Sequence, residues 1–263
     1  MERMETSAPV MSGRSEIDTN SRILYTQKEK DMITQNKQFT YPKLERITRP
    51  DGVRHYLDDL GIPHSSVTTI LGATEDKTGL MEWRAWVGDK KADQIRDDAC
   101  SLGTLMHTHL ENWMVGEERP RGSNVIRKMA TNMADVIIEQ GLSNVEEVWA
   151  MEEMLYFPGL YAGTADLIGI HNGEPAIMDY KTTNKMKSKD KIQNYACQLA
   201  AYALAHNELF DTNIRRGVIF MVARDLSFQE YVFEGKEFEK AVETWMERLE
   251  MFFSQQQASL EQS

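Results

Sequence analysis

The pattern of apolar and polar positions separates a polar first part of the chain from a patterned remainder. Residues 1–37 are dominated by Ser, Thr, Asn, Gln, Lys and Glu and show no sustained apolar period, which predicts a flexible tail. From residue 38 to residue 263 apolar positions recur in helix-like and strand-like periods, with no repeats and no long linker. We therefore expect a single folded domain over 38–263.

The periods within this domain predict an order of elements. Two strand-like runs within 41–57 flank Arg49-Pro50-Asp51-Gly52, whose residue types are typical of a tight turn, and so predict a β-hairpin. The other predicted strands are 145–157, 160–171, 174–181, 216–223 and 228–233, and the predicted helices are 66–71, 79–87, 91–114, 123–140, 188–207 and 236–255. Helices around a mixed sheet indicate the α/β class, with a helical region preceding the main strands.

One turn allows the pairing of side chains to be worked out from the sequence. Asn172-Gly173 between alternating apolar runs is the strongest short-range signal for a two-residue hairpin loop. Asp166 and Asp179 each lie six positions from the nearer loop residue, so they face each other across the two strands. Lys181 comes two residues after Asp179 and therefore points to the same face.

Two facing carboxylates have Cβ atoms about 5 Å apart and repel each other, at a cost in strands otherwise built for burial. A divalent cation neutralises such a pair, and Mg²⁺ is commonly held by one or two carboxylates with waters and a substrate phosphate. Lys181 could stabilise charge at phosphorus, or orient and deprotonate a water. The alternative, which these three residues leave equally open, is a structural ion pair between the lysine and one aspartate.

Four motifs, in order along the chain, carry a resemblance to a known family. Gly163-Thr164-Ala165-Asp166 followed by Ile177-Met178-Asp179-Tyr180-Lys181-Thr182 resembles the G-x-x-D and V-D-Y-K-T motifs of the PD-(D/E)xK nuclease superfamily, in its RecB-like branch. Ala165 stands where the nominal motif has proline. Gly103-Thr104-Leu105-Met106-His107 with Glu111 resembles the G-T-x-x-H-x-x-x-E helix, and Gln198 with Tyr202 resembles the Q-x-x-x-Y helix.

A further resemblance lies nearer the N-terminus. Ser66-Val67-Thr68-Thr69-Ile70-Leu71, followed by Leu80 and Trp83, is similar to the S-V-T-x-I-L and L-x-x-W elements of the mitochondrial genome maintenance exonucleases and their phage and bacterial relatives. The resemblance then covers about residues 41–205. It implies a restriction-endonuclease-like core and a helical arch over 66–117.

The resemblance also implies roles for the motif residues. His107, Asp166, Asp179 and the backbone carbonyl of Tyr180 would hold Mg²⁺ or Mn²⁺, and Lys181 would act in catalysis together with the two aspartates. The supporting residues would be Glu111, which shares a helix face with His107, and Glu153, which the sequence cannot separate from its neighbour Glu152.

Several residues are candidates for contact with DNA, each with a structural alternative. They are Gln198, Tyr202, Ser66, Thr68 and Lys185. Ser and Thr at a helix start are more often caps, and a lysine run such as 185–191 is often only a solvated face. Trp83 and Trp86 could stack on unpaired bases, although tryptophan on a helical apolar face is usually core.

Composition limits the possible partners and surroundings. The chain has 30 basic and 41 acidic residues, a net charge of −11, which argues against bulk coating of nucleic acid and leaves room only for a local basic groove. Two cysteines, Cys100 and Cys197, are too few for a four-cysteine iron–sulfur cluster and are expected to be free thiols. No signal segment or membrane span is recognisable, which predicts a cytoplasmic or other reducing compartment.

The expected function is hydrolysis of single-stranded or end-bearing DNA by a Mg²⁺- or Mn²⁺-dependent exonuclease acting in replication, recombination or repair. Two alternatives remain: a structure-specific endonuclease on the same core, and a non-catalytic DNA-binding or assembly protein. The likeness to phage relatives leaves a phage-encoded protein open, and nothing in the sequence indicates a protein partner.

Overall fold

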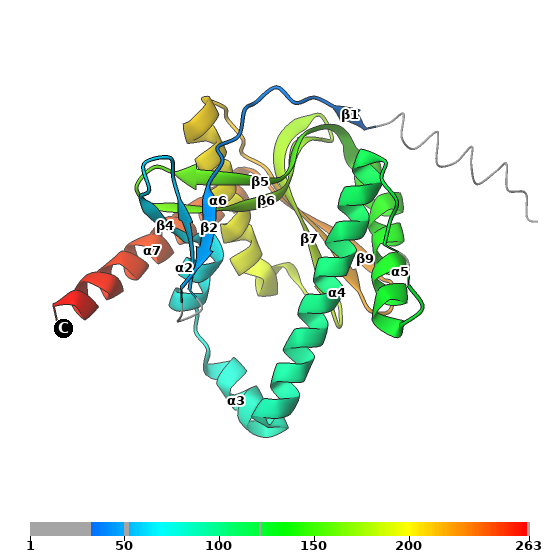
Figure 1. Cartoon of the computed structure of the whole chain (residues 1–263), viewed down its shortest axis with the longest axis horizontal. Coiled ribbons are helices and arrows are strands. Elements are labelled where there is room, and N and C mark those ends of the chain that lie inside the picture. Colours follow the sequence, from blue (N-terminus) through cyan, green and yellow to red (C-terminus); the bar gives the residue numbers. More distant parts are fainter. Residues whose placement is uncertain (1–32, 50–52, 121, 262–263) are drawn as a thin grey trace, which may run out of the picture. The chain divides into compact units, whose positions relative to one another are not determined.

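A computed structural model describes residues 33–49, 53–120 and 122–261, and these contain one mixed β-sheet with helices on both faces (Figure 1). The strands are β1 (Thr34–Gln35), β2 (Glu45–Thr48), β3 (Arg54–Leu57), β4 (Pro63–Ser66), β5 (Val145–Phe157), β6 (Tyr161–His171), β7 (Glu174–Thr183), β8 (Gly217–Ala223) and β9 (Phe228–Phe233). The helices are α2 (Val67–Thr74), α3 (Thr78–Val87), α4 (Asp89–Val115), α5 (Val125–Gln140), α6 (Gln193–Phe210) and α7 (Gly235–Leu260), with short 3₁₀ turns η1 (Leu142–Asn144) and η2 (Lys189–Ile192). The predicted α/β class is confirmed.

The sheet is built around β6, which lies between neighbours on both sides. The main strand order is β2-β3-β4-β6-β7-β8-β9, and β5 pairs with both β6 and β1. The pairs β4–β6, β7–β8 and β1–β5 are parallel and the others are antiparallel, which makes the sheet mixed. Strand β8 is buried at every position, as expected for an apolar run covered on both faces.

Two apolar clusters cover the two faces of this sheet. One cluster joins α2, α6 and α7 to residues such as Leu155, Ile177 and Trp245. The other joins α4 and α5, which run side by side in Figure 1, to residues such as Met178 and Phe220. Because β7 alternates between these clusters, Asp179 in its middle is buried, while Lys181 near its end is half-buried.

The predicted helical region forms α2, α3 and α4. Ser66 caps α2 by accepting a hydrogen bond from Thr69 N at 3.0 Å, and α4 ends at Gly116 in the left-handed conformation that glycine favours. Helix α3 has no buried residue and lies at the end of this region farthest from the sheet (Figure 1). Helix α3 and the adjoining start of α4 therefore extend away from the body, whereas α2 packs against it.

The sequence missed two strands. Residues 63–66 have too few apolar positions to signal a strand, yet β4 pairs with β3 and β6 and links the first hairpin to the main sheet. Residues 33–37 were assigned to the tail, but Thr34–Gln35 pair with β5. The remainder of the predicted tail and the turn residues 50–52 lie outside the described residues, while β2 and β3 on either side of that turn pair as predicted. None of the helices described is both long enough and apolar enough to cross a membrane.

Candidate metal centre and active site

The β6–β7 turn has the predicted length and register. Asn172 and Gly173 both have positive φ values, 48° and 79°, as a two-residue type I′ turn requires. Pairing runs from His171 opposite Glu174 to Leu167 opposite Met178, so the next facing pair is Asp166 and Asp179. At this step the ladder ends, and Tyr180 N donates a hydrogen bond to Asp166 Oδ2 at 3.2 Å. The strands therefore separate where the two carboxylates meet.

Lys181 lies on the same face as Asp179 and contacts it. The distance from Lys181 Nζ to Asp179 Oδ2 is 2.5 Å, so the ion pair that the sequence left as an alternative is present. Burial, together with the charge of Asp166, raises the pKa of Asp179 to about 7 despite the lysine. Burial alone would lower the pKa of Lys181, but Asp179 and Asp166 raise it, which keeps the side chain cationic.

A third carboxylate reaches the same place from β5. Glu152 lies between Met151, which pairs with Leu167, and Glu153, which pairs with Ala165, so Glu152 is opposite Asp166. Its φ of 49° is a left-handed conformation that costs a residue with a side chain about 1–2 kcal/mol. Glu152, Asp166 and Asp179 therefore form a row of acids across β5, β6 and β7.

His107 on α4 completes the group. Its Nδ1 lies 3.6 Å from Glu152 Oε1 and 3.6 Å from Asp166 Oδ2, and ligand atoms of these three residues all lie within 4.8 Å of one another. Burial would lower the pKa of His107, but Asp166, Glu152 and Asp179 outweigh it and raise the pKa to about 9. The site therefore attracts positive charge, which is what a cation-binding centre requires.

The orientation of the histidine ring also fits a metal ligand. The Nε2 atom lies 3.0 Å from the carbonyl oxygen of Tyr180, and since a carbonyl can only accept, the histidine is the donor. A hydrogen bond of this kind leaves Nδ1 as the coordinating atom of the neutral ring. One nitrogen and two carboxylate oxygens converging in this way fit a divalent ion such as Mg²⁺ or, with its tolerance of imidazole, Mn²⁺.

The side chains that converge are not all the predicted ligands. Tyr180 O accepts a hydrogen bond from His107 Nε2, and its role as a metal ligand stays a prediction. Asp179 is held by Lys181, and Glu152 joins the group in its place. Glu153, which pairs with Ala165 beside this position, lies closer to Tyr41, whose pKa its charge helps to raise after the effect of burial.

Glu111 lies one helical turn beyond His107, as predicted. Burial, followed by the charge of Glu152, raises its pKa, while His107 acts in the opposite direction. No hydrogen bond to a ligand residue ties Glu111 down within the described part of the chain. Its position is that of an outer acid beside the group.

The Gln198 and Tyr202 pair supports the aspartates from α6. Gln198 Nε2 donates to Asp179 Oδ1 at 3.5 Å, and both side chains are buried. Tyr202 is also buried and lies against the first motif, since a Cβ added to Gly163 would come within 2.6 Å of Tyr202 Cε1. Glycine is required there because of this close approach. The predicted contact of these two residues with DNA has little exposed surface available to it.

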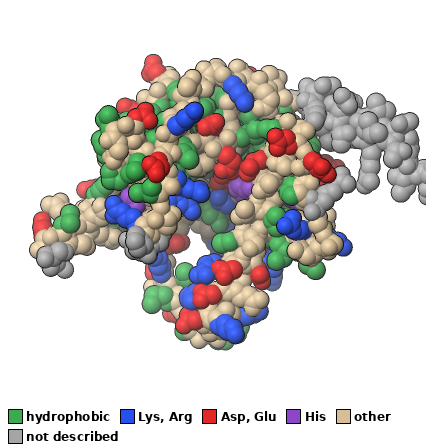
Figure 2. All heavy atoms as spheres, in the orientation of Figure 1, with side chains coloured by type: hydrophobic (Ala, Val, Ile, Leu, Met, Phe, Trp, Pro, Cys, Tyr) green, Lys and Arg blue, Asp and Glu red, His purple; other side chains and the backbone are tan. Residues whose placement is uncertain are grey.

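The remaining predicted DNA contacts lie farther out. The Ser66 hydroxyl is buried and used in capping α2, while Thr68 beside it is exposed. Lys185 is exposed just beyond β7. Trp83 is half-buried, and Trp86 is 84% exposed on α3. Acidic side chains gather beside a histidine at the centre of the face in Figure 2, above a hollow that separates the body from the helical extension.

Comparison with protein families identifies this arrangement. The model of the PD-(D/E)XK nuclease superfamily matches residues 117–261, which include both aspartates, the lysine and the α6 pair. The chain belongs to the PD-(D/E)XK nuclease superfamily. Members generally use divalent metal ions, in keeping with the His107, Glu152 and Asp166 group.

Two other comparisons add little detail. The crystal structure of a "putative exonuclease" from Eubacterium rectale is similar, with a TM-score of 0.46 and 12% identity over 60% of this chain. The match spans 65% of that protein's length. A comparison with curated proteins finds no match.

Glu152 is the member of the site that the sequence reasoning did not select. The signal was available in part, because Pro158-Gly159-Leu160 connects β5 to β6 and Phe157 pairs with Tyr161. Counting back from this loop places Glu152 opposite Asp166. The loop lacks an Asn-Gly pair, however, so its length could not be read with the same certainty as that of the second turn.

Proposed function

We propose that this protein is a metal-dependent deoxyribonuclease that hydrolyses phosphodiester bonds. The observation that carries the proposal is the convergence of His107, Glu152 and Asp166 beside the Asp179–Lys181 ion pair. This arrangement of one nitrogen, two carboxylates and a paired lysine is suited to phosphate chemistry. A metal ion bound by the first three groups, together with the lysine, would face the anionic substrate.

The ion would be held by His107, Glu152 and Asp166, with Asp179 at the edge of the group. When bound, it would supply Lewis-acid polarisation of a phosphoryl oxygen and make an attacking water more acidic. Lys181, kept protonated by two aspartates, places positive charge where negative charge develops at phosphorus.

The other residues of the site position these groups. Gln198 holds Asp179 from α6, and Asp179 in turn fixes the Lys181 ammonium. Tyr180 acts twice, since its carbonyl orients the His107 ring and its N–H holds Asp166. Because neighbouring groups of the protein hold each of these side chains, the charges are preorganised before a substrate arrives.

Exonuclease action on single-stranded or end-bearing DNA, in replication, recombination or repair, is the mode that we propose. It is supported by the motif order shared with the RecB-like branch and by the projecting α3–α4 region beside the site. An exonuclease of this kind would act on DNA strands that can enter the active site. Helix α3 is exposed, and its Trp86, at 84% exposure, offers a surface on which unpaired bases could stack.

The test is digestion of end-labelled single- and double-stranded DNA with Mg²⁺, Mn²⁺ or EDTA, alongside Lys181→Ala and Asp179→Asn. We expect cleavage with either metal, none with EDTA, and shortening from an end. Cleavage in EDTA, or cleavage by Lys181→Ala at the wild-type rate, would overturn the mechanism. Cleavage of a closed single-stranded circle would point to an endonuclease, and binding without cleavage by the wild type would point to a non-catalytic protein.

A further inference from the structure

A second concave region lies just beyond the catalytic lysine, at the end of β7. It encloses about 470 Å³, which is enough for a nucleotide phosphate with its sugar. Thr182 and Thr183 line it directly after Lys181, together with Lys185, Lys187 and, from the β8–β9 connection, Arg224. Helix α4 contributes Ala99 and Leu102 to the opposite wall. We call this region the basic pocket.

The basic pocket concentrates unpaired positive charge in a chain whose net charge is −11. Three of its lining residues are cationic and none is acidic. Among the described residues Lys185, Lys187 and Arg224 form no ion pair, whereas Lys189 of the same lysine run is tied to Glu237 at 2.5 Å. Within the run 185–191, Lys189 therefore has a structural partner, whereas Lys185 and Lys187 line the basic pocket.

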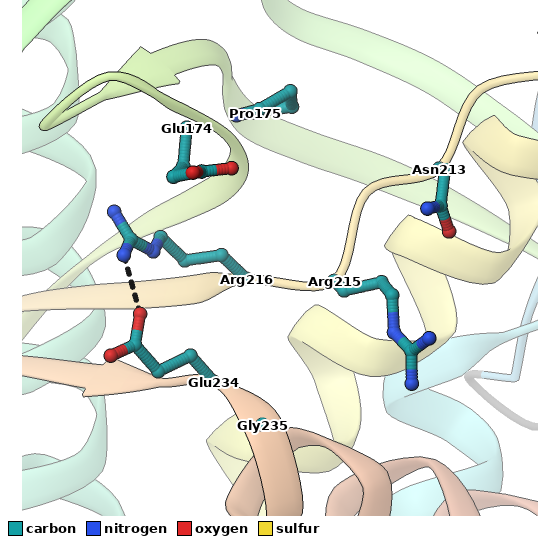
Figure 3. Close-up of a pocket in the computed structure, with 7 residues that line it drawn as sticks. All are labelled: Glu174, Pro175, Asn213, Arg215, Arg216, Glu234 and Gly235. Atoms are coloured by element: carbon teal, nitrogen blue, oxygen red, sulfur yellow. Dashed lines mark hydrogen bonds and ion pairs between the residues drawn. The ribbon is translucent and has the colours of Figure 1, made fainter.

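A pocket of similar size at the opposite end of the sheet shows the contrast (Figure 3). It encloses about 420 Å³ and contains Arg215 and Arg216, but also Glu174 and Glu234. Arg216 is paired with Glu234, as the dashed line marks. Its positive charges are neutralised by its own walls, so it offers an anion little net attraction.

Three contacts connect the basic pocket to the active site. Tyr195 lies between the two places, with Lys181 Nζ 5.1 Å and Lys187 Nζ 5.5 Å from its ring centre. A Cβ added to Gly103 would lie 3.9 Å from Thr182 Oγ1, so α4 runs beside this threonine of the pocket wall. Ala99, Gly103 and His107 follow one another at four-residue intervals and share a helix face.

We propose that the basic pocket binds a phosphate group of the DNA substrate through Lys185, Lys187 and Arg224. This phosphate is adjacent, along the same strand, to the phosphate that is cleaved. The inference rests on the proposed function, because it names a substrate subsite of that centre. Arginine and lysine are the side chains that recognise phosphate, and the threonine hydroxyls can donate to its oxygens. Three cations suit a terminal phosphate monoester, with about two negative charges, at least as well as an internal diester.

The test is equilibrium binding in EDTA, where cleavage does not interfere. Fluorescence anisotropy of the full chain is measured over a range of salt with internally labelled single-stranded oligonucleotides bearing a 5′-phosphate, a 3′-phosphate or two hydroxyl ends. The pocket variant combines Lys187→Gln with Arg224→Gln. The matched control combines Lys236→Gln with Lys240→Gln, two exposed lysines of α7 that do not line the basic pocket.

We expect about tenfold weaker binding by the pocket variant and a salt dependence lower by about 0.7 in slope, as for the loss of one phosphate contact. The control should bind like the wild type, and Arg224→Lys should restore most of the affinity. A loss confined to phosphate-ended strands assigns the pocket to a terminal phosphate, and a loss on all strands assigns it to an internal one. Equal binding by pocket variant and control overturns the inference.

The binding measurements, taken together with the cleavage assay with Mn²⁺, separate this inference from the proposed function. If the wild type cleaves DNA with Mn²⁺ while the pocket variant binds like the control, only the inference fails. If the wild type binds but never cleaves, the proposed function fails and the pocket is still scored by binding. A wild-type chain that binds none of the oligonucleotides overturns both.

Discussion

The β6–β7 hairpin has an ionisable cluster at each end, and the two clusters differ in the sign of one pKa shift. At the turn, Glu230 is contacted by His171 Nε2 at 3.3 Å and by Asn144 Nδ2 at 2.9 Å. Burial would raise the pKa of Glu230, but these two partners lower it. At the open end, burial and Asp166 raise the pKa of Asp179 to about 7. Burial raises the pKa of both carboxylates, but the Glu230 side chain is 19% exposed and that of Asp179 only 3%, so the partners outweigh burial at Glu230 and not at Asp179.

The difference shows which end is built for a ligand. At the turn, His171 and Asn144 contact the acid, and Arg216 donates to the carbonyl of His171 at 2.8 Å, which completes a structural network. At the open end, three acids in a row face one lysine and one histidine. Such an excess of like charge lowers stability, and the natural reason to retain it is a bound cation.

The largest expected effect is the loss of cleavage at the open end. Lys181→Ala should lower the initial rate of DNA cleavage with Mn²⁺ about a thousandfold, because it removes the fixed positive charge at the phosphate. The measurement is the rate per folded molecule on an end-labelled strand. Glu230→Gln is the control at the turn end, and an equal loss in that variant would contradict the assignment of the two ends.

Adjacent acids on β5 sharpen the comparison. Glu152→Gln should weaken Mn²⁺ binding about 10- to 100-fold, because it removes one carboxylate from the group around His107. Isothermal titration calorimetry measures this affinity. Glu153→Gln is the matched control, since it removes the same charge one residue away from the group, and it should bind Mn²⁺ like the wild type. Equal weakening by both variants would show that Glu152 is not a ligand.

Stability should respond at the turn end. Glu230→Ala removes the acceptor of Asn144 and the carboxylate beside His171, and it should lower the free energy of unfolding by about 2 kcal/mol, measured in urea. Because the pKa of Glu230 is lowered in the folded protein, its contribution is present above the unfolded value of 4.5 and is lost as the pH falls further. Cleavage per folded molecule should be unchanged; a parallel loss of cleavage would show that the two ends are coupled.

The last prediction concerns how the stability of the metal-free protein depends on pH. The pKa of Asp179 rises from 3.8 to about 7 on folding, so the folded chain binds more protons between these values and loses stability as the pH increases through them. Asp179→Asn should remove this pH dependence of the free energy of unfolding, measured by urea denaturation with EDTA. Identical pH profiles for wild type and variant would exclude an uncompensated charge at this position.

The sequence by itself determined the local geometry of the site. The Asn172-Gly173 turn and the two-residue period of strands are local rules, and the structure confirms the pairing up to Leu167 and Met178 with Lys181 on the face of Asp179. The central strands and the longer helices followed for the same reason, since their periods persist over many residues. These features depend on neighbours in the chain.

Only the tertiary structure decided which elements meet around those residues. Glu152, and not Glu153, reaches His107 because β5 pairs irregularly and Glu152 has a positive φ. The Tyr180 carbonyl accepts a hydrogen bond from a histidine 73 residues away in the chain. Arg224 joins Lys187 in the basic pocket because β8 lies beside β7. Local propensity fixes the direction of a side chain along its own strand, but packing between distant segments fixes what that side chain faces.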